Sequence, residues 1–319
     1  MATTKTFKFR GEQERLDKCL ALHFPNLSRA EIQRLIKRGK VAVNGVAVTK
    51  PSLRLSAGDE VTAEYAPSEL PEVSDWQPPI VYEDDDIIVV NKPPGLLVHP
   101  TATQPRMSLA GALAARCQKL KTVGEDRFRP GIVHRLDVNT SGLLVVAKKQ
   151  VVYEHLKRMF QERAVVKKYL ALVHGKLEKP HGMIDLPVGR RTGHKKFEAG
   201  VGREAQTEYW VRAYYQFRPA YLKNLAGKAA LDIYTLVDVQ LHTGRTHQIR
   251  VHFSYLGHPV AGDKLYGGRF KKIDQQIFPR QFLHAYYLKF KLPNGNLKEF
   301  QIDLADDLKK VMKHLKIQT

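Results

Sequence analysis

The feature that most constrains the fold of this chain is a proline-rich, acidic stretch that breaks its hydrophobic periodicity. This stretch, "APSELPEVSDWQPP" at residues 66–79, carries acidic residues and no basic one. Such a composition is typical of a semi-extended linker and not of a packed helix or strand. We therefore expect a small domain at residues 1–65 and a larger one at residues 80–319, joined by a linker at residues 66–79.

The small domain is expected to contain a short amphipathic helix that ends near Gly39. The apolar face of this helix consists of Ile32, Leu35 and Ile36. The opposite face is basic and consists of Arg34, Lys37 and Arg38. A charged face often serves only to keep a helix in solution, but here all the charges have the same sign, which favours an anionic partner. The run "VAVNGVAV" that follows predicts a hairpin that turns at Asn44-Gly45.

In order and spacing, this helix and hairpin resemble the small RNA-binding domain named after a small-subunit ribosomal protein. The resemblance covers "ERLDKCLALHFPNLSRAEIQRLIKRGKVAVNGVAVTKPSLRLSAGDEV", residues 14–61. In that family a basic helix and a hairpin grip RNA. The resemblance therefore implies that the small domain binds RNA through the bases of this helix.

The charge of the whole chain indicates the same class of partner. Its 319 residues carry a formal net charge of +20, and an excess this large indicates a polyanion, with nucleic acid as the first candidate. No run has the length and apolarity of a membrane span, and the first residues lack the apolar stretch of a signal peptide, so we expect a cytoplasmic protein without a membrane partner. Cys19 and Cys117 are too few for a disulfide framework or a zinc cage.

The larger domain has more strand patterns than helix patterns, and the strands are often consecutive. A hairpin with an acidic tip is expected within residues 79–100, and further strands at residues 167–175, 233–241 and 282–292. Amphipathic helices are expected at residues 150–163, from Thr246 to a stop at Gly257, and in a closing segment that carries Leu304, Leu308, Val311, Met312 and Leu315. This order favours an α+β fold with a large, mainly antiparallel sheet over a doubly wound parallel one.

Motifs for nucleotide hydrolysis, dinucleotide redox chemistry and zinc catalysis are missing from the sequence. Any enzyme here is therefore expected to use side chains alone, without a cofactor or a metal. The run "HTGRTHQIRVH" contains His242, His247 and His252, but their spacing does not gather them on one face of a helix or strand, so contacts to RNA or to the core are expected. His247 and Arg250 share a face of the predicted helix, where Arg250 can pair with a buried carboxylate or with a phosphate.

The run "GIVHRLDVNTSGLLVVAKK", residues 131–149, places Asp137 between two apolar segments. Residues 132–133 and 143–147 are predicted to be strands, and residues 139–142 are turn formers. An Asp in such a connection is more often a turn or capping residue than a reactive group. Rigid strands also position reactive groups in loops. Taken alone, this run favours the turn residue and leaves the reactive group open.

Four separated stretches together resemble the family of RNA pseudouridine synthases, which modify uridines of ribosomal and transfer RNA. They are "NKPPGLLVHP", "HRLDVNTSGL", "KKYLALVHG" and "HTGRTHQIRVHFSYLGHPVAGDKLYG", and the resemblance extends over most of residues 80–290. In detail the chain resembles the branch that carries the ribosomal-protein-type domain in front and acts on large-subunit ribosomal RNA. Residues 214–234 look longer than the usual hairpin of the family, which leaves the role of that segment open.

The resemblance also implies roles for particular residues. It identifies Asp137 with the family's nucleophile, Arg250 with the basic partner that keeps this carboxylate ionised, and Tyr169 with the aromatic residue that stacks on the extruded base. Arg135 resembles the side chain that fills the gap left by the flipped base. Further bases are assigned to RNA contact: His134, His247, Arg245, and, in the Gly-rich run "VGRRTGHKK", Arg190, Arg191, Lys195 and Lys196.

Uridine isomerisation suits this set of residues. The bond from the sugar to the ring nitrogen must break, the uracil must turn, and the sugar must rejoin at carbon five, all without a redox agent. The expected partner is RNA, with ribosomal RNA or a pre-ribosomal particle foremost, and no DNA. Two other functions stay open: a noncatalytic RNA-binding or ribosome-assembly protein that retains the fold, and a nucleoside or base glycosidase.

Overall fold

The computed structural model of this chain describes residues 3–24, 27, 29–65, 77–100, 108–126, 128–191, 193–194, 196–218 and 233–318. The chain divides into two compact units, Met1–Gln77 with His99–Pro130, and Pro78–Val98 with Gly131–Thr319. Most of the predicted linker, residues 66–76, lies outside the described residues. The predicted domain limits therefore stay a prediction.

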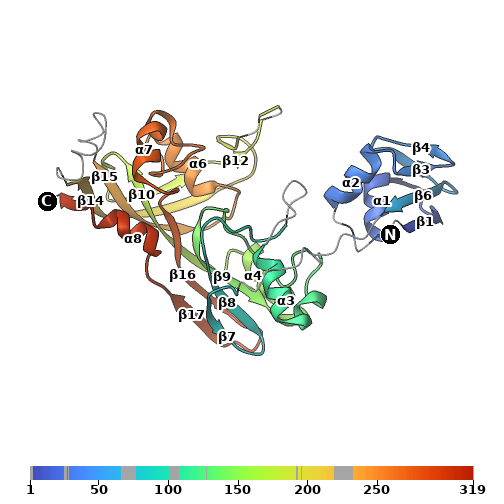
Figure 1. The fold of residues 1–319 in the computed structure, drawn as a ribbon, viewed down its shortest axis with the longest axis horizontal. Coiled ribbons are helices and arrows are strands. Elements are labelled where there is room, and N and C mark those ends of the chain that lie inside the picture. The colour runs from blue at the N-terminus through green and yellow to red at the C-terminus, as the bar shows by residue number, and fades with distance from the viewer. Residues whose placement is uncertain are drawn as a thin grey trace. The chain divides into compact units, whose positions relative to one another are not determined.

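The first unit contains a small sheet with two short helices on one side (Figure 1). Its elements are β1 (Thr3–Lys8), β2 (Gln13–Arg15), α1 (Leu16–His23), α2 (Arg29–Lys37), β3 (Val41–Val43), β4 (Val46–Ala47), β5 (Arg54–Ser56), β6 (Glu60–Tyr65), α3 (Leu109–Arg116) and the 3-10 helix η1 (Gln118–Thr122). The sheet has the order β1-β6-β3-β4, and β2 pairs with β5. The predicted helix is confirmed as α2: Ile32 and Ile36 lie in the core and Leu35 packs against it.

The predicted hairpin of the first unit is confirmed as well. β3 and β4 pair as antiparallel neighbours around Asn44 and Gly45, whose φ angles are 51° and 77°. This left-handed conformation is the one that an Asn-Gly turn requires. Asn44 also fixes the turn in place, because its side chain donates to Asp59 and accepts from the backbone N–H of Glu60.

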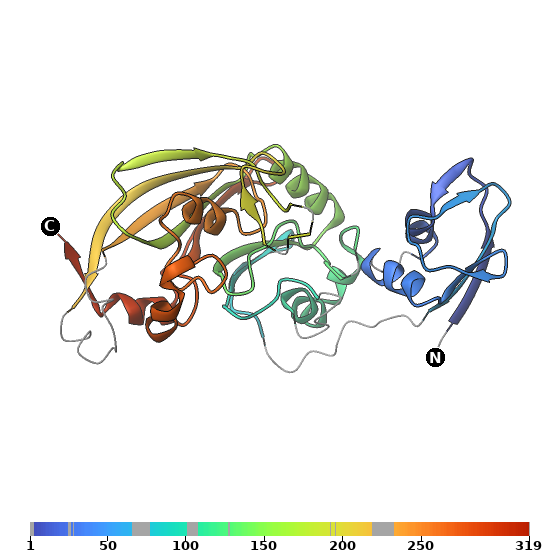
Figure 2. The same ribbon diagram turned by 90° about the horizontal axis from the view of Figure 1, so that it is seen from above.

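The second unit is dominated by one large sheet (Figures 1 and 2). Its elements are β7 (Ile80–Glu83), β8 (Ile87–Lys92), β9 (Ser141–Ala147), α4 (Gln150–Gln161), β10 (Val166–His174), β11 (His181–Asp185), β12 (Val188–Gly189), β13 (Glu198–Ala199), β14 (Gln206–Phe217), β15 (Tyr234–Leu241), α6 (Gln248–Tyr255), the 3-10 helix η3 (Gly268–Phe270), α7 (Lys271–Ile277), β16 (Leu283–Lys291), β17 (Leu297–Gln301), α8 (Asp306–Met312) and β18 (Leu315–Gln318). The strands follow the order β11-β14-β15-β10-β16-β9-β8-β7, with β17 beside β16 and β18 beside β14.

The pairing confirms the predicted α+β fold with a mainly antiparallel sheet. Within the described residues, the one parallel pair of this sheet joins β16 to β9, where His284 and Ala285 face Ser141 and Gly142. Gly142 has a φ of 124°, and a Cβ atom there would collide with the carbonyl oxygen of Ala285. Only glycine allows the two backbones to approach this closely. The first residues of β9 are thereby fixed against the middle of the sheet.

Helices cover parts of the large sheet. α4 packs against β9, and α6 lies against β14, whose long strand curves around it in Figure 2. α7 and α8 contribute Ile277, Leu308 and Val311 to a core cluster that also contains Phe217 of β14 and Tyr234 of β15. No helix among the described residues is both long enough and apolar enough to cross a membrane.

Two predictions of secondary structure are wrong. Residues 132–133 form no strand: Ile132 makes a single bridge to Val146, and the ladder ends there because the next free N–H of β9, that of Val145, donates to the His134 side chain. The closing helix is also shorter than predicted. It ends at Met312, and Leu315 begins β18 instead, which pairs with the half of β14 that β11 leaves uncovered.

Candidate active site

Asp137 lies in the loop that leads into β9, and its carboxylate meets the guanidinium of Arg250 from α6. Arg250 Nη1 donates to Asp137 Oδ2 at 2.9 Å. The Arg250 side chain is 8% exposed, whereas 16% of the Asp137 side chain is accessible. No donor within the described part of the chain forms a hydrogen bond with Asp137 Oδ1. The carboxylate is thus anchored through one oxygen, and the other oxygen keeps its lone pairs unused.

A second carboxylate, Asp263, holds the other edge of the Arg250 guanidinium. Arg250 Nε and Nη2 donate to its two oxygens at 2.7 and 2.9 Å, and the backbone N–H groups of Leu265 and Tyr266 donate to Oδ1. Burial alone would raise the pKa of Asp263, but the hydrogen bonds and charge of Arg250 lower this pKa below its usual value. Burial alone would lower the pKa of Arg250, and the two carboxylates raise it. Arg250 is therefore a fixed positive charge beside Asp137.

A buried lysine holds the peptide that follows Asp137. Lys92, at the end of β8, is fully buried, and its Nζ donates to the carbonyl oxygens of Pro93, Leu96 and Val138 at 2.8, 3.0 and 2.9 Å. Burial, together with the charge of Arg280, lowers the pKa of Lys92 to about 7. The three carbonyls satisfy the ammonium group and tie the loop that carries Asp137 to the sheet.

A buried arginine holds the next residues of the same loop. Arg280 Nη1 donates to the carbonyl oxygen of Asn139 at 3.0 Å and Nη2 donates to Ser141 Oγ at 2.8 Å, while its Nε pairs with Asp307 on α8. Ser141 Oγ lies 2.8 Å from His284 Nδ1, and the other ring nitrogen of His284 donates to a backbone carbonyl. Two cations thus grip successive carbonyls after Asp137, so that the loop is held from its buried side.

Tyr169 lies on β10, at a point where the strand register against β16 shifts between Lys168 and Tyr169. Such a bulge re-aims a side chain relative to the regular pleat. Tyr169 is 7% exposed. Burial and then the negative charge of Asp137 raise the pKa of the Tyr169 hydroxyl, so that it stays protonated at neutral pH. The structure therefore brings a neutral aromatic ring into the electrostatic reach of Asp137. The role of Tyr169 in the site stays a prediction.

His247 is the residue directly before α6, and its imidazole lies near Asp137. Its Nε2 lies 3.9 Å from Asp137 Oδ1, and its Nδ1 lies 2.9 Å from the hydroxyl of Tyr266. The rings of Phe197 and Tyr266 each meet the imidazole edge-on, at 5.7 and 5.6 Å between centroids. His247 and Arg250 thus approach the same carboxylate, but His247 precedes the helix instead of lying on it, which corrects the prediction of a shared helical face.

Two other residues assigned to RNA contact have partners inside the second unit. His134 Nε2 accepts the Val145 N–H at 3.0 Å, and burial lowers the pKa of His134 to about 3, so its ring is neutral. Arg245 is partly exposed, with its Nε bound to the carbonyl oxygen of Glu204. Arg135, between His134 and Asp137 in the same loop region, is exposed. Their contacts to RNA stay predictions.

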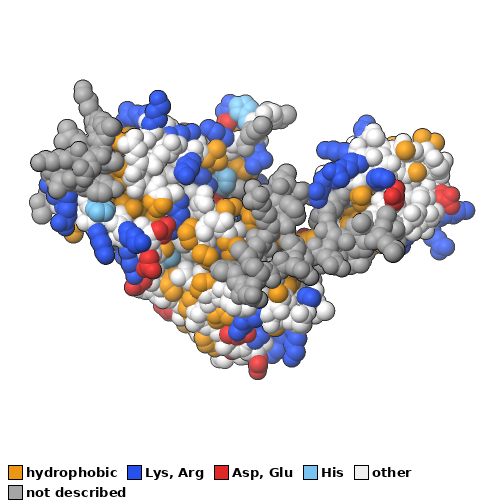
Figure 3. Space-filling view, viewed as in Figure 1, with side chains coloured by type: hydrophobic (Ala, Val, Ile, Leu, Met, Phe, Trp, Pro, Cys, Tyr) orange, Lys and Arg blue, Asp and Glu red, His pale blue; other side chains and the backbone are white. Residues whose placement is uncertain are grey.

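The remaining predicted bases lie on the surface. On α2 and just after it, Lys37 and Arg38 are exposed and Arg34 is partly buried, and Figure 3 shows blue side chains gathered over this helix. In the loop between β12 and β13, the Arg190 guanidinium stacks over Phe197 at 4.3 Å, and Arg191 pairs with Glu198 at 3.1 Å. Lys196 is exposed, and Lys195 lies outside the described residues.

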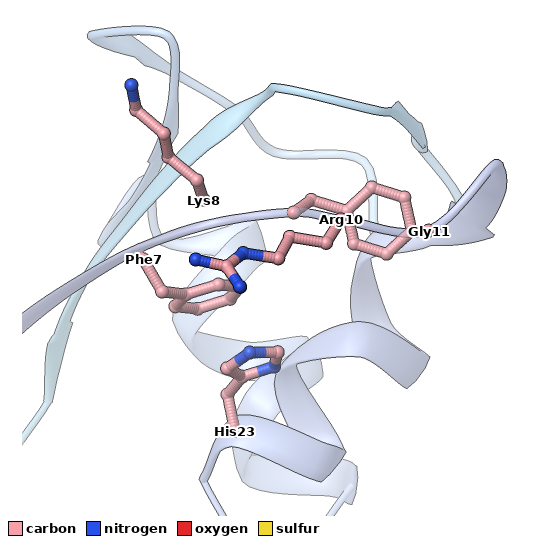
Figure 4. Close-up of a pocket in the computed structure, with 6 residues that line it drawn as sticks. Phe7, Lys8, Arg10, Gly11 and His23 are labelled. Atoms are coloured by element: carbon pink, nitrogen blue, oxygen red, sulfur yellow. The ribbon is translucent and has the colours of Figure 1, made fainter.

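The first unit contains a pocket with a volume of about 450 Å³ that is lined by Phe7, Lys8, Phe9, Arg10, Gly11 and His23 (Figure 4). Its Phe7 and His23 rings stack at 3.6 Å with an angle of 7°. In Figure 4 Arg10 extends its guanidinium toward these rings, and Lys8 points away from them. The lining is aromatic and basic and includes no carboxylate, so this pocket offers nothing comparable to Asp137.

Sequence reasoning missed the groups that position the site. Asp263 was part of the run "GHPVAGDKLYG" but received no role, and Lys92 and Arg280 were not singled out. A polar residue flanked by a buried strand and a Pro-Pro step was the one available signal for Lys92. The three histidines of "HTGRTHQIRVH" have separate partners, as expected: His242 binds Glu208, His247 meets Tyr266, and His252 is buried against Thr207.

Comparisons with known proteins identify the family of this chain. The signature of the family described as RNA pseudouridylate synthase matches residues 86–255, and that of the S4 domain matches residues 14–61. An uncharacterized RNA pseudouridine synthase of Aquifex aeolicus (strain VF5) is 41% identical over 314 residues, which cover 96% of this chain and 95% of the relative. The ribosomal large subunit pseudouridine synthase D of Vibrio cholerae (serotype O1, strain ATCC 39315 / El Tor Inaba N16961) is 38% identical, over 96% of this chain and 92% of the relative.

A solved structure has the same fold. Human RNA pseudouridylate synthase domain containing 1 superposes with a TM-score of 0.58 at 27% identity, over 80% of this chain and 92% of that chain. Together with the sequence matches, this defines a class: an RNA-modifying isomerase with an S4 domain in front. The chain belongs to the RNA pseudouridine synthase family.

Proposed function

We propose that this chain converts specific uridines of large-subunit (23S) ribosomal RNA to pseudouridine, with Asp137 as the nucleophile and without a cofactor. The family supports isomerisation of RNA uridines in general. The ribosomal target is supported by the likeness to the Vibrio cholerae protein, whose name states a role on the large ribosomal subunit. Such an activity belongs to ribosome biogenesis in the cytoplasm.

The observation that carries the role of Asp137 is the division of its two oxygens. Oδ2 is held by Arg250, and Oδ1 accepts no hydrogen bond from any described residue. A carboxylate that is paired with a fixed cation, yet has one oxygen unused, is suited to stabilise or trap a sugar cation at C1′. The buried grip on the loop fixes where that oxygen lies.

The other roles follow from the surroundings of Asp137. Tyr169 offers its ring to the uracil of a flipped uridine, and its protonated hydroxyl can hold the base by a hydrogen bond. Arg135, which is exposed next to the catalytic loop, is proposed to fill the space that the base leaves in the RNA. We further propose that residues 1–65 hold the RNA, that residues 66–79 are a linker, and that residues 80–319 carry out the chemistry.

The test is the product of the purified protein on ribosomal RNA. An isomerase leaves the RNA mass unchanged, releases no free uracil and creates a carbodiimide-reactive base at defined positions. Released uracil would identify a glycosidase. Binding without any modified base in ribosomal or transfer RNA would contradict the proposal and favour a protein that only binds RNA.

A further inference from the structure

His247 has a backbone conformation that a histidine adopts at a cost. Its φ and ψ are 58° and 19°, in the left-handed region, directly before α6. This conformation is unfavourable for a residue with a Cβ atom, and it persists at sites where the surrounding structure imposes it. The His247 side chain does not cap α6. The left-handed conformation therefore serves to direct the imidazole elsewhere, toward Tyr266 and Asp137.

The neighbouring residues impose this conformation. Gln248, which is 2% exposed, accepts from Thr243 Oγ1 and the Arg245 N–H, and it donates to the Gln206 carbonyl and to Thr207 Oγ1. The His247 carbonyl accepts the Val251 N–H as the first hydrogen bond of α6. The backbone is thus fixed on both sides of His247.

Tyr266 faces Nδ1 of His247 and can donate a hydrogen bond to it. The Tyr266 hydroxyl oxygen accepts the Phe197 N–H at 3.3 Å, and burial raises the pKa of this hydroxyl, so its own proton is available to His247 Nδ1 at 2.9 Å. With Nδ1 as acceptor, the ring proton lies on Nε2. Burial lowers the pKa of His247, which keeps the ring neutral. A neutral N–H is therefore presented on the side of Asp137 Oδ1.

His247 Nε2 and Asp137 Oδ1 form no direct hydrogen bond, but they lie close enough together to face the same uridine. Nε2 and Oδ1 are 3.9 Å apart, too far for a hydrogen bond between them. The proposed reaction puts C1′ of the uridine at about 3–3.5 Å from Oδ1. The uracil N1 is bonded to C1′, and the carbonyl oxygen O2 belongs to the ring carbon next to N1. O2 is thus the uracil oxygen nearest to the bond that breaks.

We propose that His247 is a further catalytic residue, whose neutral Nε2–H donates a hydrogen bond to O2 of the flipped uracil as the C1′–N1 bond breaks. This inference rests on the proposed function, in which Asp137 acts at C1′. The electron pair of the C1′–N1 bond passes to the uracil and is shared by N1 and the carbonyl oxygens, while Asp137 Oδ1 bonds to C1′ or stabilises its charge. His247 donates a hydrogen bond without losing its proton. When C5 rejoins C1′, an Oδ1–C1′ bond formed in the first step breaks and its electron pair returns to Asp137. The C5 proton then leaves and N1 gains one, so that substrate and product have the same composition.

A neutral imidazole suits this role better than a charged one. An imidazolium next to Asp137 would form an ion pair with Oδ1 and occupy the oxygen that has to act at C1′. A neutral donor aimed at developing charge, in a site held rigid beforehand, lowers the barrier without that competition. Arg250 supplies the permanent charge, and His247 supplies the directed hydrogen bond.

The test uses the full-length chain, a mapped target RNA and the variant His247→Gly, because glycine adopts the left-handed backbone freely. His247→Asn is the second variant, since asparagine tolerates the same backbone and keeps an N–H donor on a shorter side chain. We expect single-turnover rates at saturating protein to fall about 10²–10³-fold in His247→Gly and less in His247→Asn. The RNA Kd and the melting temperature are expected to stay close to those of the wild type.

Two sulfur-substituted RNAs locate the hydrogen bond. In 2-thiouridine, sulfur replaces O2 and is a weaker hydrogen-bond acceptor. With this RNA, the rate of the wild type is therefore expected to fall by a larger factor than the rate of His247→Gly. With 4-thiouridine, the two proteins are expected to change by the same factor. Equal factors with 2-thiouridine would overturn the contact to O2.

Two further outcomes separate the inference from the proposed function. A weaker Kd with an unchanged saturating rate would make His247 only an RNA-binding residue and overturn its catalytic role. Wild-type protein that modifies no RNA at all would instead contradict the proposed function, before any variant is compared.

Discussion

The cations around Asp137 and the cations on the surface have the same chemistry and opposite surroundings. As whole residues, Lys92, Arg250 and Arg280 are 0%, 7% and 4% exposed, and each donates to carbonyls or carboxylates of the second unit. Lys37 and Arg190 are exposed. Buried cations need internal partners and can only shape the site, whereas exposed cations can exchange water for phosphate. The net charge of +20 includes both the buried and the exposed cations, so it does not show which of them can bind RNA.

The largest expected effect comes from removing the charge that the buried cations surround. Asp137→Asn keeps the size of the side chain but loses the anion that stabilises the sugar cation. We expect pseudouridine formation by the purified variant to fall by about 10³-fold or more, to the background rate. The RNA Kd, measured by filter binding, should stay near that of the wild type, because the surface cations are intact.

Removing a buried cation should damage stability as well as activity. Arg250→Met leaves the Asp263 carboxylate buried without its ion pair, which costs about 3–5 kcal/mol of unfolding free energy. The matched surface change, Arg190→Met, should stay within about 0.5 kcal/mol. Urea unfolding of the two variants measures the difference. Equal losses would show that the distinction between buried and surface arginines has no energetic meaning.

Tyr169 tests whether the site needs the ring or the hydroxyl. Tyr169→Phe keeps the ring and Tyr169→Leu loses both, so we expect both to lose most turnover, with Phe binding RNA no worse than Leu. Single-turnover rates and Kd values of the two variants separate the roles. Full activity of the Phe variant would remove the hydroxyl from the reaction and leave stacking alone.

Burial of Lys92 makes the unfolding free energy of the protein depend on pH. Burial lowers its pKa from 10.5 to about 7, so between these values the unfolded chain binds more protons than the folded one. Its contribution to the unfolding free energy therefore rises with pH from about 7 to about 10.5 and is constant below that range. Lys92→Met should be less stable by about 1–3 kcal/mol, from unpaired carbonyls, and should lack this rise. Wild-type and variant unfolding curves with parallel pH dependence would contradict the assignment.

The smallest expected effect concerns surface bases. Replacing Arg190 and Arg191 by Ala should weaken binding equally for all RNA sequences and flatten the slope of log affinity against log salt by roughly one unit per lost phosphate contact. Arg191 is paired with Glu198 and Arg190 stacks on Phe197, so RNA must compete with these contacts. An unchanged slope would exclude this loop from the RNA-binding surface.

Sequence reasoning could predict the parts of the molecule that depend on local pattern. Hydrophobic alternation indicated β10, β15 and β16, and the Asn-Gly pair indicated the hairpin of the first unit. The pairing of Arg250 with Asp137 came from the resemblance, and the hydrogen bond at 2.9 Å confirms the pairing. Its consequences for catalysis stay a prediction.

The rest depends on contacts between distant parts of the chain. Lys92 reaches Val138, and Arg280 reaches Asn139, because β8, β9 and β16 are neighbours in the sheet, which no local pattern specifies. Leu315 fits the apolar stripe of a helix as well as a strand. It lies in β18 because this segment pairs with the half of β14 that β11 leaves uncovered. The left-handed backbone of His247 is likewise set by the Gln248 contacts and not by the residue itself.

The central claim, that Asp137 carries out the isomerisation of ribosomal RNA uridines, is tested most directly in cells. Cells that lack this protein receive either the wild-type chain or Asp137→Asn at equal abundance, and pseudouridines in large-subunit ribosomal RNA are mapped by carbodiimide labelling and primer extension. Each modified uridine appears as a primer-extension stop. We predict that particular stops are absent in the deficient cells, return with the wild-type chain and stay absent with Asp137→Asn. Return of the same stops with Asp137→Asn would contradict the claim.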